Sequence, residues 1–368
     1  MLLGVRLVKL WLRRIHLVIA LFAGLFLINS SITGTLLIYA KKIQQEINPS
    51  YWQVKSQESP LSLPDIIATV EKQTAEKVRF LEPEESANLA WQVQLDNQQY
   101  VSVNPYSGEI LLQYHFYDTF YGFTLGLHRW LLFKDQNEKT PFRVLVSTAT
   151  LCLIVELLLG FYLWVKPKNR IKRLKINKKA KSKILFYQLH TVIGVYILLP
   201  LLLVAFSGMT FYWKTQTASV VELLTLSNID ERPSPPTIQV EPSAQLQLGL
   251  ALENGLNSLP EARLFRLYMA TDQKQAMALR VQMPGEIHGN SWIWVNPYSA
   301  EVLNVFDASQ TSFATQVWNL RYKFHIGDFA GPLIQFVWIF VGLTPLFFVF
   351  SGCYLWFCRH KRIKPTCK

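Results

Sequence analysis

Long apolar runs separated by two long polar segments are the main pattern in this chain. The runs at 15–39, 141–165, 186–213 and 332–358 are each long enough to cross the hydrocarbon core of a bilayer, which needs about 20 residues. They predict four transmembrane helices with both termini on one side. The remaining segments are an N-terminal stretch (1–14), two large modules (40–140 and 214–331), a basic loop (166–185) and a tail (359–368).

Each large module follows the same order of elements. In the first, apolar residues at helical spacing predict a helix over Pro60–Thr74, and alternating apolar and polar residues predict four strands after it. In the second, Ser243–Asn257 reads as the matching helix, again followed by four strands. The predicted strands are Val78–Leu81, Leu89–Leu95, Tyr100–Asn104, Glu109–Tyr114, Leu264–Met269, Ala276–Gln282, Trp292–Asn296 and Glu301–Phe306.

Several motifs recur in the two halves of the chain. The turn sequences NPYSGE at 104–109 and NPYSAE at 296–301 are 192 residues apart, as are GFYLW at 160–164 and GCYLW at 352–356. We therefore predict an α-helical membrane protein, with a four-helix transmembrane bundle built as a twofold internal repeat and two small α+β modules.

The basic residues predict the orientation. Residues 1–14, 166–183 and 359–368 carry four, ten and five Lys or Arg, respectively, and no acid. The positive-inside rule places these segments on the cytoplasmic side of the membrane and the two modules on the outer side. The formal net charge of +12 then reflects topology and attraction to lipid headgroups rather than nucleic-acid binding.

Other function classes find little support in the sequence. It has no H-E-x-x-H motif, no Gly-rich phosphate loop and no nucleophile motif. The four cysteines fall in the spans or the cytoplasmic segments, so no disulfide or C-x-x-C metal site is expected outside. Although residues 1–30 have the outline of a secretory signal, the first run is longer than a signal core, and we expect no cleavage.

The helix, the strands and the NPYSG turn resemble a PepSY domain. The runs IHLVIALFAGLFLINSSITG, GLHRWLL, QLHTVIGVYILLPLLLVAFSG and FHIGDFAGPLIQFVWIFVGL are similar to the helix motifs of the PepSY-associated transmembrane helix family. That family includes iron-regulated membrane proteins and inner-membrane ferric-siderophore reductases with two b-type haems. Some relatives carry a fused flavin reductase domain, whereas this chain continues for only ten residues after the fourth run, so the resemblance implies an external electron donor.

Four of the seven histidines occupy equivalent places in the two halves. His16 and His190 begin spans one and three, and His128 and His325 precede spans two and four. In an antiparallel bundle, His16 can face His190 at the inner side and His128 can face His325 at the outer side. Each pair supplies the two imidazoles that an electron-transfer haem requires, so we predict two haems b with these four histidines as axial ligands.

Four glycines agree with this arrangement. His16 and Gly34, like His190 and Gly208, are eighteen residues apart, which is five helical turns or roughly 27 Å. We expect Gly34 and Gly208 to make room for the outer haem. Gly160 and Gly352, at the inner ends of spans two and four, would make room for the inner one.

Simpler readings of these residues remain open. A histidine near a helix end is often an interfacial anchor, and small residues in a span often mark helix contacts. The pairing of His128 is the least determined, because His128 lies thirteen residues before Pro141, whereas His325 lies seven before Pro332. The other histidines, His115, His288 and His360, have no repeat partner.

Glu156 is the one acid inside a predicted span. A carboxylate at that depth is costly unless it is paired, so it is a candidate functional residue. It could orient the imidazole of His16 or His190, take up a proton when the inner haem is reduced, or serve only as a hydrogen-bonding link within the bundle.

These residues and the family resemblance lead to two alternative hypotheses for the function. The first is a transmembrane oxidoreductase that passes electrons from a quinol or a cytoplasmic reductant to ferric iron in a siderophore or another ferric chelate. The modules would dock this acceptor, with Trp292, Trp294, Tyr106 and Tyr298 as either an apolar wall or module core. The alternative is a haem-free membrane anchor whose two modules regulate a periplasmic peptidase or sensor.

Overall fold

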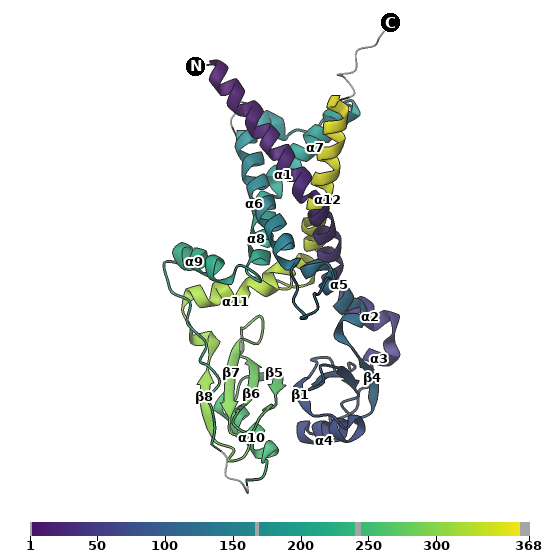
Figure 1. Cartoon of the computed structure of the whole chain (residues 1–368), viewed down its shortest axis with the longest axis vertical. Helices are drawn as coiled ribbons and strands as arrows, with labels where there is room; N and C mark the ends of the chain where they lie inside the picture. Colours follow the sequence, from purple (N-terminus) through teal and green to yellow (C-terminus); the bar gives the residue numbers. More distant parts are fainter. Residues whose placement is uncertain (1, 166–168, 240–243, 361–368) are drawn as a thin grey trace. The chain divides into compact units, whose positions relative to one another are not determined.

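The computed structural model describes residues 2–165, 169–239 and 244–360. The chain divides into two compact units (Figure 1). The membrane unit consists of Met1–Tyr39, Thr124–Ser219 and Arg321–Lys368, and the sheet unit consists of Ala40–Phe123 and Val220–Leu320. Residues 361–368 of the predicted tail and residues 166–168 of the basic loop lie outside the described residues.

Three helices of the membrane unit are long and apolar enough to cross a bilayer. They are α1 (Leu2–Leu37), α6 (Arg143–Val165) and α12 (Pro332–His360). Helices α7 (Ser182–Tyr196) and α8 (Leu198–Met209) together make a fourth candidate span, with a bend of 66° between them. The chain is therefore a multi-pass membrane protein, as the apolar runs predict.

The bend between α7 and α8 was not predicted, because the apolar run at 186–213 is continuous. Pro200 accounts for it, since proline has no N–H and its ring clashes with the carbonyl of Tyr196, four residues earlier. Pro345 lies within α12, which continues through it. There the hydroxyl of Thr344 donates to the carbonyl oxygen of Val341 at 2.6 Å, which satisfies the acceptor that proline leaves without its usual donor.

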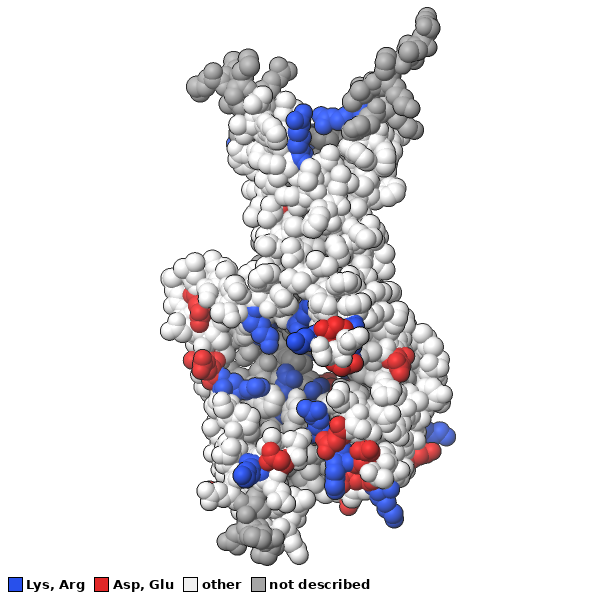
Figure 2. All heavy atoms as spheres, in the orientation of Figure 1, with Lys and Arg blue, Asp and Glu red and all other residues white. Residues whose placement is uncertain are grey.

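Aliphatic side chains fill the centre of the membrane unit. Helix α1 packs against α6 and α12, α6 packs against α8, and α12 packs against α7. Small residues at these contacts, such as Ala23 and Ala205, allow the helices to approach closely. Large apolar residues such as Phe22 and Leu25 point outward, and Figure 2 shows few charged atoms on the visible face of these helices. This is the surface that a lipid environment requires.

The sheet unit contains one antiparallel sheet of eight strands. Its order is β4-β3-β2-β1-β5-β6-β7-β8, so the two predicted modules share a single sheet. They join where β1 pairs with β5, with Phe80 opposite Tyr268 and Leu81 opposite Leu267. The strands are β1 (Val78–Glu82), β2 (Trp91–Leu95), β3 (Tyr100–Val103), β4 (Ile110–Tyr114), β5 (Arg263–Tyr268), β6 (Met277–Gln282), β7 (Ser291–Val295) and β8 (Val302–Phe306).

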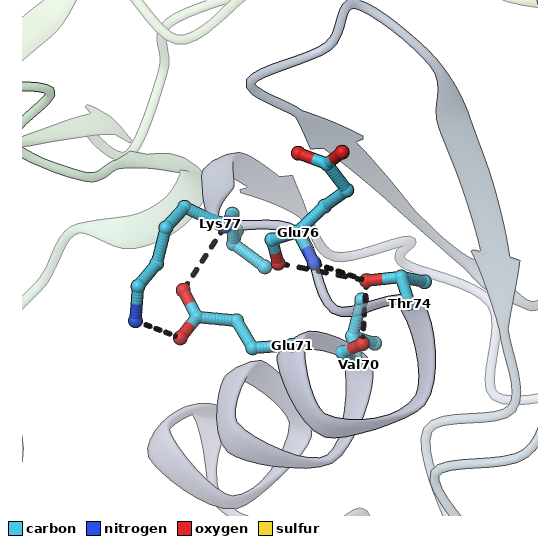
Figure 3. Close-up of polar contacts among 6 residues, drawn as sticks. Val70, Glu71, Thr74, Glu76 and Lys77 are labelled. Carbon is cyan, nitrogen blue, oxygen red and sulfur yellow. Dashed lines mark hydrogen bonds and ion pairs between the residues drawn. The ribbon is translucent and has the colours of Figure 1, made fainter.

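Helices α4 (Leu63–Thr74) and α10 (Leu248–Ser258) supply the rest of the core of this unit. Ser62 caps α4 by accepting a hydrogen bond from the backbone N–H of Asp65. After α4, Glu71 accepts hydrogen bonds from Lys77 Nζ at 2.7 Å and from the backbone N–H of Val78 at 3.0 Å (Figure 3). These contacts fix the connection between α4 and β1.

Several short elements were not predicted. Most important are α5 (Phe120–Trp130) and α11 (Phe313–His325), which precede α6 and α12 along the chain. The others are α2 (Ala40–Ile47), α3 (Pro49–Trp52), α9 (Lys214–Thr225) and the 3-10 turns η1 (Phe116–Asp118), η2 (Ile171–Leu174) and η3 (Ala308–Gln310).

Candidate paired-histidine sites

The first pair of histidines joins α1 and α7. The ring centres of His16 and His190 are 6.5 Å apart, with the ring planes at 83°. A metal–imidazole bond is about 2 Å long and the ring centre lies about 1.1 Å behind the nitrogen, so two imidazoles on opposite sides of one metal would have centres about 6.2 Å apart. The observed separation fits a shared metal.

The second pair joins α5 and α11. His128 and His325 lie in the last turns of these two helices, and their ring centres are 6.3 Å apart. His128 is farther along the chain from Pro141 than His325 is from Pro332. The additional residues form the segment between α5 and α6, where Leu131 and Leu132 have positive φ values of 59°. The structure thus brings together the two pairs that the sequence suggests.

A hydroxyl group determines which nitrogen of His128 is protonated. Thr33 Oγ1 lies 3.0 Å from His128 Nδ1 and donates its own proton to the carbonyl oxygen of Asn29 at 2.6 Å. Because a hydroxyl has one proton to donate, Thr33 must accept from Nδ1–H. The lone pair of His128 is then on Nε2, where a metal could bind.

The same arrangement holds His325. Its Nδ1 lies 3.1 Å from Ser207 Oγ and 3.1 Å from the carbonyl oxygen of Val204. The Ser207 hydroxyl donates to that same carbonyl at 2.9 Å. Both neighbours of Nδ1 are therefore acceptors, so the proton is on Nδ1 and the lone pair on Nε2.

In the inner pair, the hydroxyl of Ser351 contacts His190 in the same manner. His190 Nδ1 is 2.7 Å from Ser351 Oγ, and Ser351 donates to the carbonyl oxygen of Phe348 at 3.3 Å. His190 is accordingly the donor to Ser351, and its Nε2 is the nitrogen available to a ligand.

His16 differs from the other three because its partner is a carboxylate. Glu156 Oε2 lies against His16 Nδ1, and the Glu156 side chain is only 9% exposed. Because a carboxylate can only accept, the proton of the neutral imidazole is on Nδ1 and the lone pair is on Nε2. Glu156 Oε1 is buried without a hydrogen-bond partner among the described residues. Of the two histidines that the sequence offered as partners of Glu156, the structure selects His16.

Each of the four glycines lies next to one of the histidine rings. A Cβ atom added at Gly34 would lie 3.0 Å from His128 Cε1, and one at Gly208 would lie 3.0 Å from His325 Cε1. At Gly160 and Gly352 the corresponding distances to His16 and His190 are 3.8 and 4.0 Å. The outer glycines therefore make room for the imidazole rings themselves.

A two-residue motif in the sequence, a hydroxyl residue followed by glycine, marks the residues that contact the histidine Nδ1 atoms. Thr33–Gly34, Ser207–Gly208 and Ser351–Gly352 each place the hydroxyl that binds Nδ1 just before the glycine that the ring approaches. The glycines alone supported the prediction from the sequence, and the hydroxyls add a second, independent feature. At the fourth place Leu159 precedes Gly160, and Glu156, one turn earlier, supplies the polar partner.

The remaining histidines are not part of these pairs. His115 lies 3.4 Å from the side-chain amide of Gln99 in the sheet unit, and His288 packs edge-on against Phe265. The side chain of His360 lies outside the described residues. Among the described residues, no group of three or more His, Cys, Asp or Glu side chains could hold a metal ion.

One known sequence family matches this chain over nearly its whole length. The sequence profile of a family described as the PepSY-associated TM region matches residues 13–359. Among curated proteins, no match to this sequence was found.

Proposed function

Because the chain belongs to the PepSY-associated TM family, we propose that it is a di-haem b protein that passes electrons across the bacterial inner membrane. In this proposal, α1, α6, the bent pair α7–α8 and α12 form a four-helix bundle derived from a twofold repeat. Both termini are cytoplasmic and the sheet unit is periplasmic, as the basic segments suggest.

One observation carries the proposal: all four imidazoles present Nε2 as the free nitrogen, in two facing pairs. A haem iron would need two such nitrogens from the protein. The residues present therefore fit haem. His16 with His190 and His128 with His325 would hold the two irons, and haem would supply a one-electron redox centre at each place.

The protein's own residues would fix the rings and exclude water. Thr33, Ser207, Ser351 and Glu156 hold Nδ1 and so set the direction of each Nε2. Gly34, close to His128, and His16 are eighteen residues apart on α1, so the pairs are separated by roughly 27 Å along that helix. Between them the bundle is packed with apolar residues such as Leu27, Leu153 and Leu201, which favours the passage of electrons without protons.

The acceptor in this proposal is ferric iron in a siderophore or another ferric chelate in the periplasm. One electron reduces Fe³⁺ to Fe²⁺, a softer ion that hard oxygen ligands hold less tightly, so the metal is released. The electron comes from a quinol or a cytoplasmic reductant. The activity would be that of a transmembrane ferric-chelate reductase in iron uptake.

The test is the absorption spectrum and haem content of the purified full-length protein. We expect a reduced b-type spectrum and two haems per chain, falling to one in His16→Ala and one in His325→Ala. His115→Ala is the matched control and should retain both. Protein that is intact and colourless would refute the proposal and favour a haem-free anchor for periplasmic regulatory modules, whereas two haems in each variant would refute the ligands.

A further inference from the structure

A row of aromatic side chains crosses the face of the sheet opposite α4 and α10. Leu81 and Leu267 belong to the helix-covered core, so their strand neighbours Phe80 and Tyr268 lie on the other face. The ring centres of successive members are 5.5 to 6.1 Å apart, and the row passes from one half of the sheet to the other. Its members in order are Trp294, Trp292, Tyr268, Phe80 and Tyr100.

Three arginines lie over these rings. Arg232 is 4.3 Å from the ring centre of Trp292, and Arg280 is 5.8 Å from the same centre. Arg266 lies 4.4 Å from the centre of Phe80. We call Arg232, Arg266, Arg280, Phe80, Tyr268 and Trp292 the arginine–aromatic face.

Positive charge exceeds negative charge on this face. Arg266 and Arg280 are directly opposite each other on β5 and β6, a placement of like charges that destabilises a sheet. Glu82 accepts hydrogen bonds from Arg266, one of them from Nε at 2.8 Å. Burial and then the neighbouring Arg266 lower the pKa of Arg280, although Tyr268 and Glu82 oppose the shift.

Arg280 and Arg232 make no ion pair with a carboxylate among the described residues. Arg280 donates through Nε to the carbonyl oxygen of Gly289, and Arg232 is exposed and stacked on Trp292. The two guanidinium groups flank one half-buried indole, which is stacked in turn on Trp294 and Tyr268. The site therefore combines two positive charges with a half-buried aromatic surface.

We propose that the arginine–aromatic face binds the ferric chelate, and that the chelate is a polyanionic one with aryl oxygen ligands, of the catecholate class. This inference rests on the proposed function and deepens it. Flat aryl rings can stack beside Trp292, and their oxygens can accept paired hydrogen bonds from guanidinium groups. A polyanion also supplies the negative charge that Arg232 and Arg280 lack.

The test uses gallium(III) tris-catecholate, a trianionic complex that is not reduced under these conditions, and isothermal titration calorimetry on the full-length protein in nanodiscs of zwitterionic lipid. We expect Arg232→Gln and Arg280→Gln each to weaken binding about tenfold or more. Arg280→Lys should be weakened as well, because it retains the charge and loses the planar fork. Arg263→Gln, which removes the same charge from the exposed start of β5, should bind normally.

Three results would overturn the inference. One is unchanged binding in the Arg232→Gln/Arg280→Gln double variant with a normal melting temperature. Another is equal or tighter binding of the neutral gallium(III) tris-acetohydroxamate. The third is equally tight binding of glycerol 3-phosphate, which would point to lipid headgroups instead. Because gallium binding needs no haem, colourless protein would refute the electron conduit while leaving this measurement intact.

Discussion

Alanine at Gly34 or Gly208 should weaken the outer haem site selectively. The added Cβ would lie 3.0 Å from Cε1 of His128 or His325, whereas carbon atoms in favourable contact are about 3.5 to 4.0 Å apart. The ring would have to retreat by roughly 0.5 Å or more. Its Nδ1 contacts oppose that movement, since Thr33 and Ser207 hold the two rings at 3.0 and 3.1 Å.

The size of the effect follows from the cost of overpacking. Inserting a methyl group into a packed site costs about 1 to 3 kcal/mol, which corresponds to about 5- to 150-fold in haem affinity. We expect Gly208→Ala to purify with close to one haem per chain, the inner one, when haem is limiting. Gly24→Ala is the matched control on α1, because its Cβ would come no closer than 3.4 Å to Val349.

The assay is the pyridine haemochrome per chain, combined with the low-temperature spectrum of each variant. If Gly34→Ala and Gly208→Ala retained two haems with unchanged spectra and affinities, these glycines would not serve to admit the imidazoles. If Gly24→Ala lost haem equally, the effect would belong to helix packing in general.

The inner glycines test a different idea. At Gly160 and Gly352 a Cβ would meet the histidine rings only at 3.8 and 4.0 Å, so the protein alone tolerates alanine there and should keep its melting temperature without haem. A selective loss of the inner haem from either variant is the expected result, because the porphyrin would need the space. Full occupancy would contradict that role.

The remaining predictions concern the partners of the rings and one carboxylate of the sheet unit. Glu156→Gln should raise the midpoint potential of the inner haem, because the carboxylate that makes His16 a stronger donor becomes neutral; an unchanged redox titration would exclude this role. Ser351→Ala removes the acceptor for His190 Nδ1–H and should weaken retention of the inner haem by about 10- to 100-fold in competition with apomyoglobin, whereas unchanged retention would count against the contact. Hydrogen bonds from the backbone and hydroxyl groups at the start of α11 lower the pKa of Asp230, so its contribution to stability is present above the ordinary carboxyl pKa and lost as the pH falls through the lowered value. Asp230→Asn should therefore reduce the acid-induced fall in melting temperature of the sheet unit, and an identical pH profile would refute this.

Local patterns predicted most of the fold. The eight strands lie within one or two residues of the alternating runs that indicated them, and α4 lies within the predicted 60–74 but begins at Leu63, after the Ser62 cap. The resemblance to the PepSY-associated family is confirmed by the match over 13–359. The pairing of β1 with β5 was not predictable, because two antiparallel edges far apart in sequence carry no signal that they meet. Helices α5 and α11 lie inside the segments assigned to the two modules, between the last predicted strand and the next apolar run, where no helix was predicted.

The candidate sites were only partly visible in the sequence. Repetition identified the four histidines, and the charge of Glu156 singled it out within an apolar run. The hydroxyl partners could not be assigned a role from the sequence, because serine and threonine are common in membrane helices, where they often bond only to their own backbone. Their role becomes apparent only when their second contact, to an imidazole Nδ1, is seen.

The seam between β1 and β5 has a consequence for how such a chain could arise. Phe80 and Leu81 pair with Tyr268 and Leu267 in the middle of a symmetric strand order. A half-length polypeptide would leave the edge of β1 bare and prone to association. Two copies could close it by joining β1 to β1 about a twofold axis, giving a homodimer with the same eight strands. In this chain both halves are present, so the same kind of pairing is made within one polypeptide.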